Sequence, residues 1–146
     1  MNLADNIDRL ILESTKSRDK ERTEVFKAIK NEFLIFKTAK DAKPLTEEAE
    51  INLLLKMVKQ REDSAYQFEQ GGRKELAEKE RFEISILKEF LPKEVTKEDI
   101  EQKFQELFGE TIEQKQMGIA IKTLKTQLLG ADGALIATVV REKIQK

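Results

Sequence analysis

The chain has 146 residues, of which 38% are charged, yet its 27 basic and 28 acidic residues nearly cancel to a formal net charge of -1. A protein that binds nucleic acid mainly by salt-dependent attraction is usually strongly basic, so any such binding here must come from a local patch. The chain contains no Cys and no His. These absences exclude disulfides, thiolate chemistry and Cys-ligated zinc within the chain, and they remove the commonest general base and metal ligand. We therefore expect no catalytic residue, no metal site and no other cofactor.

The sequence also bears on the protein's location. Residues 1–9 contain Asp5 and Asp8 and lack an extended apolar run, so we expect no signal peptide. No segment approaches the roughly 18 consecutive apolar residues that a transmembrane helix needs. We expect a cytoplasmic protein with no membrane partner.

Apolar residues recur at helical spacing through the first 92 residues and predict four helices. The first runs from residue 3 to about 16 and the second from about 19 to 40, with either a kink or a full break near Ser17. Thr46 is the expected N-cap of a third helix over 47–70, which Gly71 and Gly72 end because glycine adopts a left-handed cap at little cost. A fourth helix then reaches Pro92. Its expected inward-facing residues are Leu76, Ala77, Ile84, Leu87 and Leu91.

Three shorter helices are predicted after Pro92. Thr96 and Asp99 form a capping-box pattern at the start of the first, the second covers about 115–129, and Asp132 is the expected cap of the third. The sequence thus predicts an all-α protein, with an N-terminal long-helix bundle over 1–92 and a small three-helix tail domain over 93–146. A core this small is marginal, so we expect the tail to depend on the first domain or on a partner.

The stretch from Lys59 to Pro92 carries a family resemblance. It includes Lys59-Gln60-Arg61, Asp63-Ser64, Gly72-Arg73, Leu76-Ala77 and Phe90-Leu91-Pro92, and Met117-Gly118 and Ala131-Asp132-Gly133 follow downstream. Together these residues resemble the GatB/YqeY family. Its members are small bacterial proteins similar to the carboxy-terminal tail region of the GatB component of the aspartyl/glutamyl-tRNA amidotransferase.

The resemblance implies an all-α fold and a link to glutamine-dependent amidation of mischarged tRNA, in which the tail region helps to hold the tRNA. It does not imply that this chain is an enzyme, because the amidase and kinase centres of that complex lie outside the similar region. The chain departs from the family at two positions. Ile119 and Gly130 stand where the family commonly has basic residues, so both changes remove positive charge near the expected RNA-facing end.

Two basic surfaces are candidates for RNA contacts. Lys27 and Lys30 lie at spacings that bring them to one side of the second helix, although interleaved acidic residues also fit an ordinary solvated face. Residues 115–146 contain six basic and two acidic side chains, a local balance of +4. The candidates in this tail are Lys115, Lys122, Lys125, Arg141 and Lys143.

A third set of polar residues lies around the turn between the third and fourth helices. Arg61, Asp63, Ser64 and Arg73 are candidates for docking a partner, because arginines can donate two hydrogen bonds to one anion. The alternative is an ion network that only stabilises the bundle. The eight Phe residues lie on apolar stripes and are expected in the core.

These observations favour a non-catalytic accessory module that binds tRNA or a protein of an amidotransferase or other translation-related complex. One alternative is a carbon–nitrogen ligase that uses glutamine as amido donor. Another is a protein-interaction scaffold with no role in RNA binding.

Overall fold

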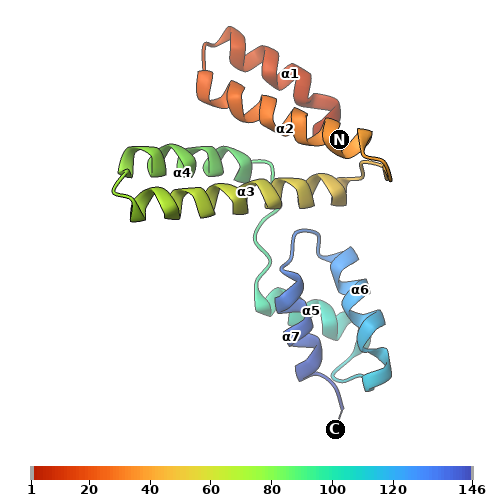
Figure 1. Cartoon of the computed structure of the whole chain (residues 1–146). Coiled ribbons are helices and arrows are strands. Elements are labelled where there is room, and N and C mark those ends of the chain that lie inside the picture. Colours follow the sequence, from red (N-terminus) through yellow and green to blue (C-terminus); the bar gives the residue numbers. More distant parts are fainter. Residues whose placement is uncertain (1, 146) are drawn as a thin grey trace. The chain divides into compact units, whose positions relative to one another are not determined.

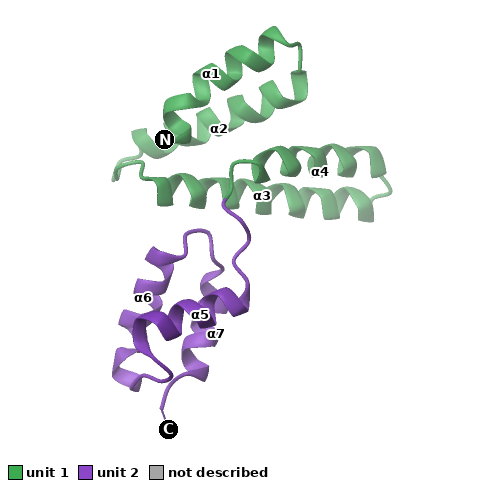
Figure 2. Ribbon diagram, turned by 180° about the vertical axis from the view of Figure 1, so that it is seen from behind, with its two compact units in different colours: residues 1–91 green, residues 92–146 purple. Residues whose placement is uncertain are grey.

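The computed structural model describes residues 2–145, in which the regular structure is almost entirely helical (Figure 1). This confirms the predicted all-α class. The chain divides into two compact units, Met1–Leu91 and Pro92–Lys146, which are coloured separately in Figure 2. No helix within residues 2–145 combines the length and the apolar character needed to cross a lipid bilayer.

The first unit consists of two pairs of neighbouring helices (Figure 1). One pair is α1 (Leu3–Lys16) with α2 (Lys20–Thr38), and the other is α3 (Glu47–Gln70) with α4 (Lys74–Lys88). Apolar side chains from all four helices form one core, because each helix has an apolar stripe that must be removed from water. The largest fully buried side chains of this core are Phe26, Ile29, Leu54, Met57, Ile86 and Leu87.

A full break, and not a kink, separates α1 from α2. The turn at this break is of the same type as the turn between α3 and α4. After α1, the Asp19 N–H donates to the Ser14 carbonyl at 2.9 Å and the Arg18 N–H donates to the Thr15 carbonyl at 3.1 Å. These two bonds define a Schellman motif, in which the residue after the C-cap is left-handed. That residue is Arg18, with a φ of 61°. Left-handed backbone costs a residue with a side chain about 1–2 kcal/mol.

The turn after α3 has the same hydrogen bonds with a different residue. The Arg73 N–H donates to the Phe68 carbonyl at 2.7 Å and the Gly72 N–H donates to the Glu69 carbonyl at 3.1 Å. Here the left-handed position is Gly72, with a φ of 76°, which confirms the predicted glycine stop. One turn is therefore made without strain, whereas the other contains an arginine in a conformation that favours glycine.

Glu50 caps a helix that lies far from it in the sequence. Its side chain is only 3% exposed, and its Oε2 accepts a hydrogen bond of 2.8 Å from the Ala4 N–H in the first turn of α1. Asn2, the N-cap residue of α1, makes no side-chain capping bond. The carboxylate from α3 thus satisfies one of the backbone donors that the start of α1 leaves unpaired.

The second unit contains α5 (Lys97–Phe108), a short 3-10 helix η1 (Gln114–Gln116), α6 (Met117–Gln127) and α7 (Gly133–Glu142). The capping box predicted at the start of α5 is present, and Asp132 caps α7 by accepting the Ala134 N–H at 3.0 Å. An isolated parallel bridge joins Ile112 to Ile144. The core of this unit contains Ile100, Phe104, Leu124, Ile136, Val139 and Val140.

Two predictions for α4 are wrong. Leu76, predicted to face inward, is 37% exposed, and Phe82, predicted in the core, is 46% exposed. Ile86 is fully buried instead. The burial of Ile86 has a physical reason: α4 packs against both α2 and α3, so it buries a second stripe beside the one that was read from its sequence. Leu76 and Phe82 lie outside these two buried stripes.

Candidate nucleic-acid interface

The surface of α6 is basic and contains no acidic side chain. Residues 114–131 include three lysines and neither Asp nor Glu. Lys122 and Lys125 are exposed, and no carboxylate of residues 2–145 lies within ion-pairing distance of either. Ile119, one turn before Lys122, is 67% exposed and makes this surface partly apolar.

Lys125 also lies against the start of α7. A Cβ atom built on Gly133 would be 3.4 Å from its Cε and 3.6 Å from its Nζ. The ammonium group is therefore next to the first residue of α7, and the exposed Arg141 lies in the last turn of the same helix. These cations come from elements that pack together, since α6 contacts α7 directly.

Three of the other candidate cations already have carboxylate partners. Lys30 Nζ lies 2.7 Å from an oxygen of Asp8. The corresponding distances are 3.2 Å from Lys115 to Glu113 and 3.5 Å from Lys143 to Glu101. Ion pairs that solvent reaches in this way are worth only about 0–1 kcal/mol, so a phosphate group could replace the carboxylate at little cost. Their positive charge is nevertheless locally balanced in the unbound chain.

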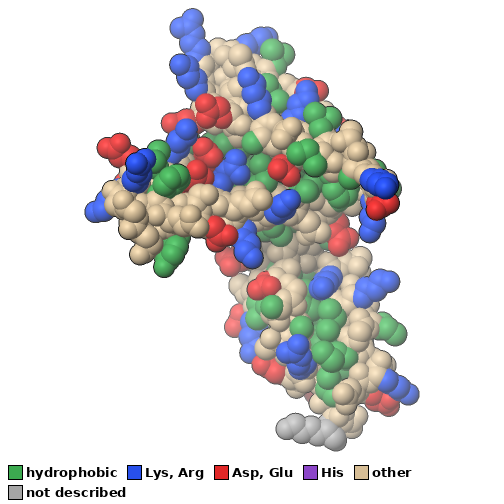
Figure 3. Space-filling model, viewed as in Figure 1, with side chains coloured by type: hydrophobic (Ala, Val, Ile, Leu, Met, Phe, Trp, Pro, Cys, Tyr) green, Lys and Arg blue, Asp and Glu red, His purple; other side chains and the backbone are tan. Residues whose placement is uncertain are grey.

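Lys27 lies in a different part of the molecule, beside the turn between α1 and α2. It lines a hollow of about 400 Å3 together with Arg18 and Lys20. Figure 3 shows Lys and Arg side chains gathered at this end of the α1–α2 pair. The side chains of Lys27 and Lys30 therefore differ in their surroundings, because only the latter is ion-paired among the described residues.

The four partner-docking candidates are spread along α3 and its turn. Arg61 Nε donates to Glu83 Oε2 at 2.9 Å, and the two side chains are only 17% and 15% exposed. Asp63 is exposed and Ser64 is half-buried on the same helix. Arg73 lies at the start of α4, and the ten residues from Arg61 to the end of α3 already span about 14 Å along the helix axis. The structure therefore does not bring the two arginines together.

A half-buried group of charges surrounds Arg61. Burial, with a contribution from the neighbouring carboxylate of Glu83, raises the pKa of Glu80 above its ordinary value, although Arg61 partly opposes the shift. Both carboxylates lie on α4, one turn apart, and Arg61 faces them from α3. This arrangement joins the two helices, which fits a structural role for Arg61.

Sequence reasoning missed a second contact of this kind. Arg22 Nη1 lies 2.8 Å from Glu89 Oε2, and its guanidinium group lies 5.3 Å from the ring centre of Phe26. The hydrogen bond to Glu89 raises the pKa of Arg22. The two residues are 67 positions apart, so no local pattern could have paired them.

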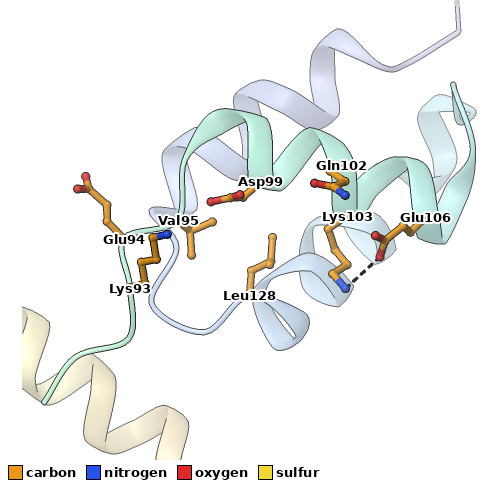
Figure 4. A pocket seen from close by; sticks show the side chains of 8 residues that line it. All are labelled: Lys93, Glu94, Val95, Asp99, Gln102, Lys103, Glu106 and Leu128. Atoms are coloured by element: carbon orange, nitrogen blue, oxygen red, sulfur yellow. Dashed lines mark hydrogen bonds and ion pairs between the residues drawn. The ribbon is translucent and has the colours of Figure 1, made fainter.

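The second unit contains a hollow of about 310 Å3, drawn in Figure 4. Val95 and Leu128 supply its apolar side chains, and Lys103 is paired with Glu106 at 3.1 Å. Hydrogen bonds from Thr96, the backbone N–H first, lower the pKa of Asp99. The charged lining residues are two lysines and three acids, so the hollow offers no positive field for an anion. They are Lys93, Glu94, Asp99, Lys103 and Glu106.

Within residues 2–145, no three acidic side chains are grouped as metal ligands would be. The fold and these surfaces define a small helical protein with basic patches and structural ion pairs. The sequence model of the Yqey-like protein family matches residues 4–144, and the chain belongs to this family. It is also similar to the Uncharacterized protein C22F3.15 of Schizosaccharomyces pombe, with 36% identity over 92 residues, which are 62% of this chain and 73% of that protein.

Proposed function

We propose that this protein is a non-catalytic accessory module that binds RNA in connection with glutamine-dependent tRNA amidation. In this proposal residues 1–92 form a bundle domain and residues 93–146 form a tail domain that contacts RNA phosphates. The observation that carries it is the basic surface of α6, where Lys122 and Lys125 are exposed in a segment without acidic residues. Membership of the Yqey-like family supports the link to amidation.

The charge distribution supports contacts to phosphate groups. Lys122 and Lys125 are three residues apart on α6 and therefore project from neighbouring positions on its surface. Their ammonium groups have no competing carboxylate partner among the described residues, so binding a phosphate would not first require an ion pair to break. Arg141 on α7 can add a further contact in the same unit. Contacts of this type fix the position of a nucleic acid without reading its sequence.

A titration of tRNA binding at several salt concentrations tests the proposal. The double variant Lys122→Gln/Lys125→Gln removes two phosphate contacts. It should therefore weaken binding at least about tenfold at 0.1 M salt and reduce the slope of log K against log salt by about 1.4–1.8. The matched control is Lys56→Gln/Lys59→Gln on α3, which removes the same charge from two other exposed lysines.

The control should retain almost all of the affinity. Equal losses in the two double variants would mean that tRNA responds only to net charge, and would contradict a specific role for α6. A wild-type protein that does not bind tRNA even at low salt would refute the proposal. In that case a protein-interaction role, tested by capture of partners after nuclease treatment, would take its place.

A further inference from the structure

The turn between α1 and α2 contains a side chain that the fold does not require. Arg18 and Gly72 occupy the same position in two turns with the same hydrogen bonds, and both have a positive φ. Glycine makes this turn without strain, as Gly72 shows. The guanidinium group of Arg18 forms no hydrogen bond or ion pair with residues 2–145 that would offset the strain. Arg18 therefore contributes an exposed positive charge at this point, which a glycine could not supply.

Arg18 lies beside two other cations. Together with Lys20 and Lys27 it lines the hollow of about 400 Å3 at the turn, and all three side chains are exposed. No carboxylate of the described residues is within ion-pairing distance of any of them. Lys16, also exposed, precedes Arg18 by two residues. The positive side chains at this end of the helix pair are visible in Figure 3.

The acidic and hydroxyl groups of the hollow are mostly occupied. Asp19 caps α2 by accepting the Arg22 N–H at 3.1 Å, and the Thr23 hydroxyl donates to the Ser14 Oγ at 2.7 Å. Glu24 is the second carboxylate of the lining. Three cations against two carboxylates, one of which accepts a capping bond, leave the hollow with a positive balance.

We propose that the α1–α2 turn is a phosphate-binding site, in which Arg18, Lys20 and Lys27 contact phosphates of an RNA backbone. The identity of the ligand as RNA rests on the proposed function, whereas the site itself rests on the strained arginine and the unpaired cations around it. Arginine suits this role because its planar group donates two hydrogen bonds to one phosphate and stays charged at all relevant pH values. The site gives the first unit a contact of its own, in addition to α6 in the second unit.

The variant Arg18→Gly separates binding from stability, because it should change them in opposite directions. Removing the strain should raise the melting temperature by about 4 °C or more. Loss of one phosphate contact should weaken tRNA binding about fivefold to tenfold at 0.1 M salt. Arg18→Lys retains the charge and should lose less than threefold. Lys74→Ala, which removes one exposed charge beside the equivalent turn of the other helix pair, should leave binding unchanged.

Amide chemical shifts of the nitrogen-15-labelled protein during titration with sodium tripolyphosphate give a second measurement, independent of RNA. The expected result is a saturable change at residues 18–20 that needs a clearly higher tripolyphosphate concentration in Arg18→Gly. If tRNA binds and Arg18→Gly binds it as well as the wild type, the inference is overturned while the proposed function survives. If tRNA does not bind but tripolyphosphate shifts these amides, the assignment to RNA is overturned and the phosphate site is retained. If neither tRNA nor tripolyphosphate shifts these amides, the phosphate site and its assignment to RNA are both overturned.

Discussion

Replacing Glu50 should show how strongly one buried carboxylate holds α1 in place. Glu50→Ala removes the acceptor of the Ala4 N–H and leaves that donor without its partner, whereas Glu50→Gln keeps an acceptor of similar size but removes the charge. The side chain is 3% exposed, so water cannot readily replace it. The two variants therefore separate the hydrogen bond from the charge.

The expected loss in the free energy of unfolding follows from the hydrogen bond between Ala4 and Glu50. A hydrogen bond to a charged group contributes about 1.5–3 kcal/mol, and a negative charge at a helix N-terminus contributes about 0.3–1 kcal/mol, or up to about 2 kcal/mol when partly buried. We expect Glu50→Ala to lower the free energy of unfolding by about 2–3 kcal/mol and Glu50→Gln by about 1 kcal/mol. For a unit of this size, the larger loss corresponds to a fall in melting temperature on the order of 10 °C.

Urea unfolding followed by circular dichroism measures these losses, and hydrogen exchange of the α1 amides reports where they act. Glu48→Ala is the matched control, because Glu48 lies in the same first turn of α3 but is exposed. It should change stability by less than about 0.5 kcal/mol. A Glu50→Ala variant no less stable than this control, or with unchanged protection of α1, would refute the reasoning.

Two further predictions concern the charges around Arg61. Glu83→Ala should lower the free energy of unfolding by about 2–3 kcal/mol, because it leaves a largely enclosed guanidinium group without its carboxylate. The double variant Arg61→Met/Glu83→Leu should recover most of this loss in urea unfolding. A double variant as unstable as the single one would contradict this prediction. Burial raises the pKa of Glu80 in the folded state above its value in the unfolded chain. The stability that the protonated side chain contributes is therefore fully present below the unfolded-state pKa. It is lost as the pH rises through the folded-state pKa. Glu80→Gln should therefore raise the urea midpoint slightly at pH 7, with a gain that disappears as the pH falls below about 4; the same gain at both pH values would argue against burial as the cause.

Much of the helical structure could be predicted because its signals are local. Thr46 and Gly72 lie at the two ends of α3, where a capping hydroxyl and a left-handed glycine act within a few residues. The same holds for the Thr96–Asp99 capping box. The burial of α4 was predicted less well, because α4 packs against α2 as well as α3 and no pattern within α4 identifies its second neighbour.

The candidate sites show the same division between local and distant information. Spacing predicted that Lys122 and Lys125 lie near one another on a helix, and they do. It could not predict that Lys30 is paired with Asp8, or that Arg61 is enclosed with Glu83, because these contacts join separate helices. The strain at Arg18 was equally invisible, since an arginine gives no sequence signal for a left-handed turn.

The bridge between Ile112 and Ile144 affects how the second unit can form during translation. The Ile112 N–H donates to the Lys143 carbonyl at 3.0 Å, and the Gln145 N–H donates to the Ile112 carbonyl at 2.8 Å. Ile144 also packs on the core of this unit. The nascent second unit therefore cannot complete these contacts until residues 143–145 have left the ribosome. In the first unit, by contrast, α3 and α4 are consecutive and can pair as soon as they emerge.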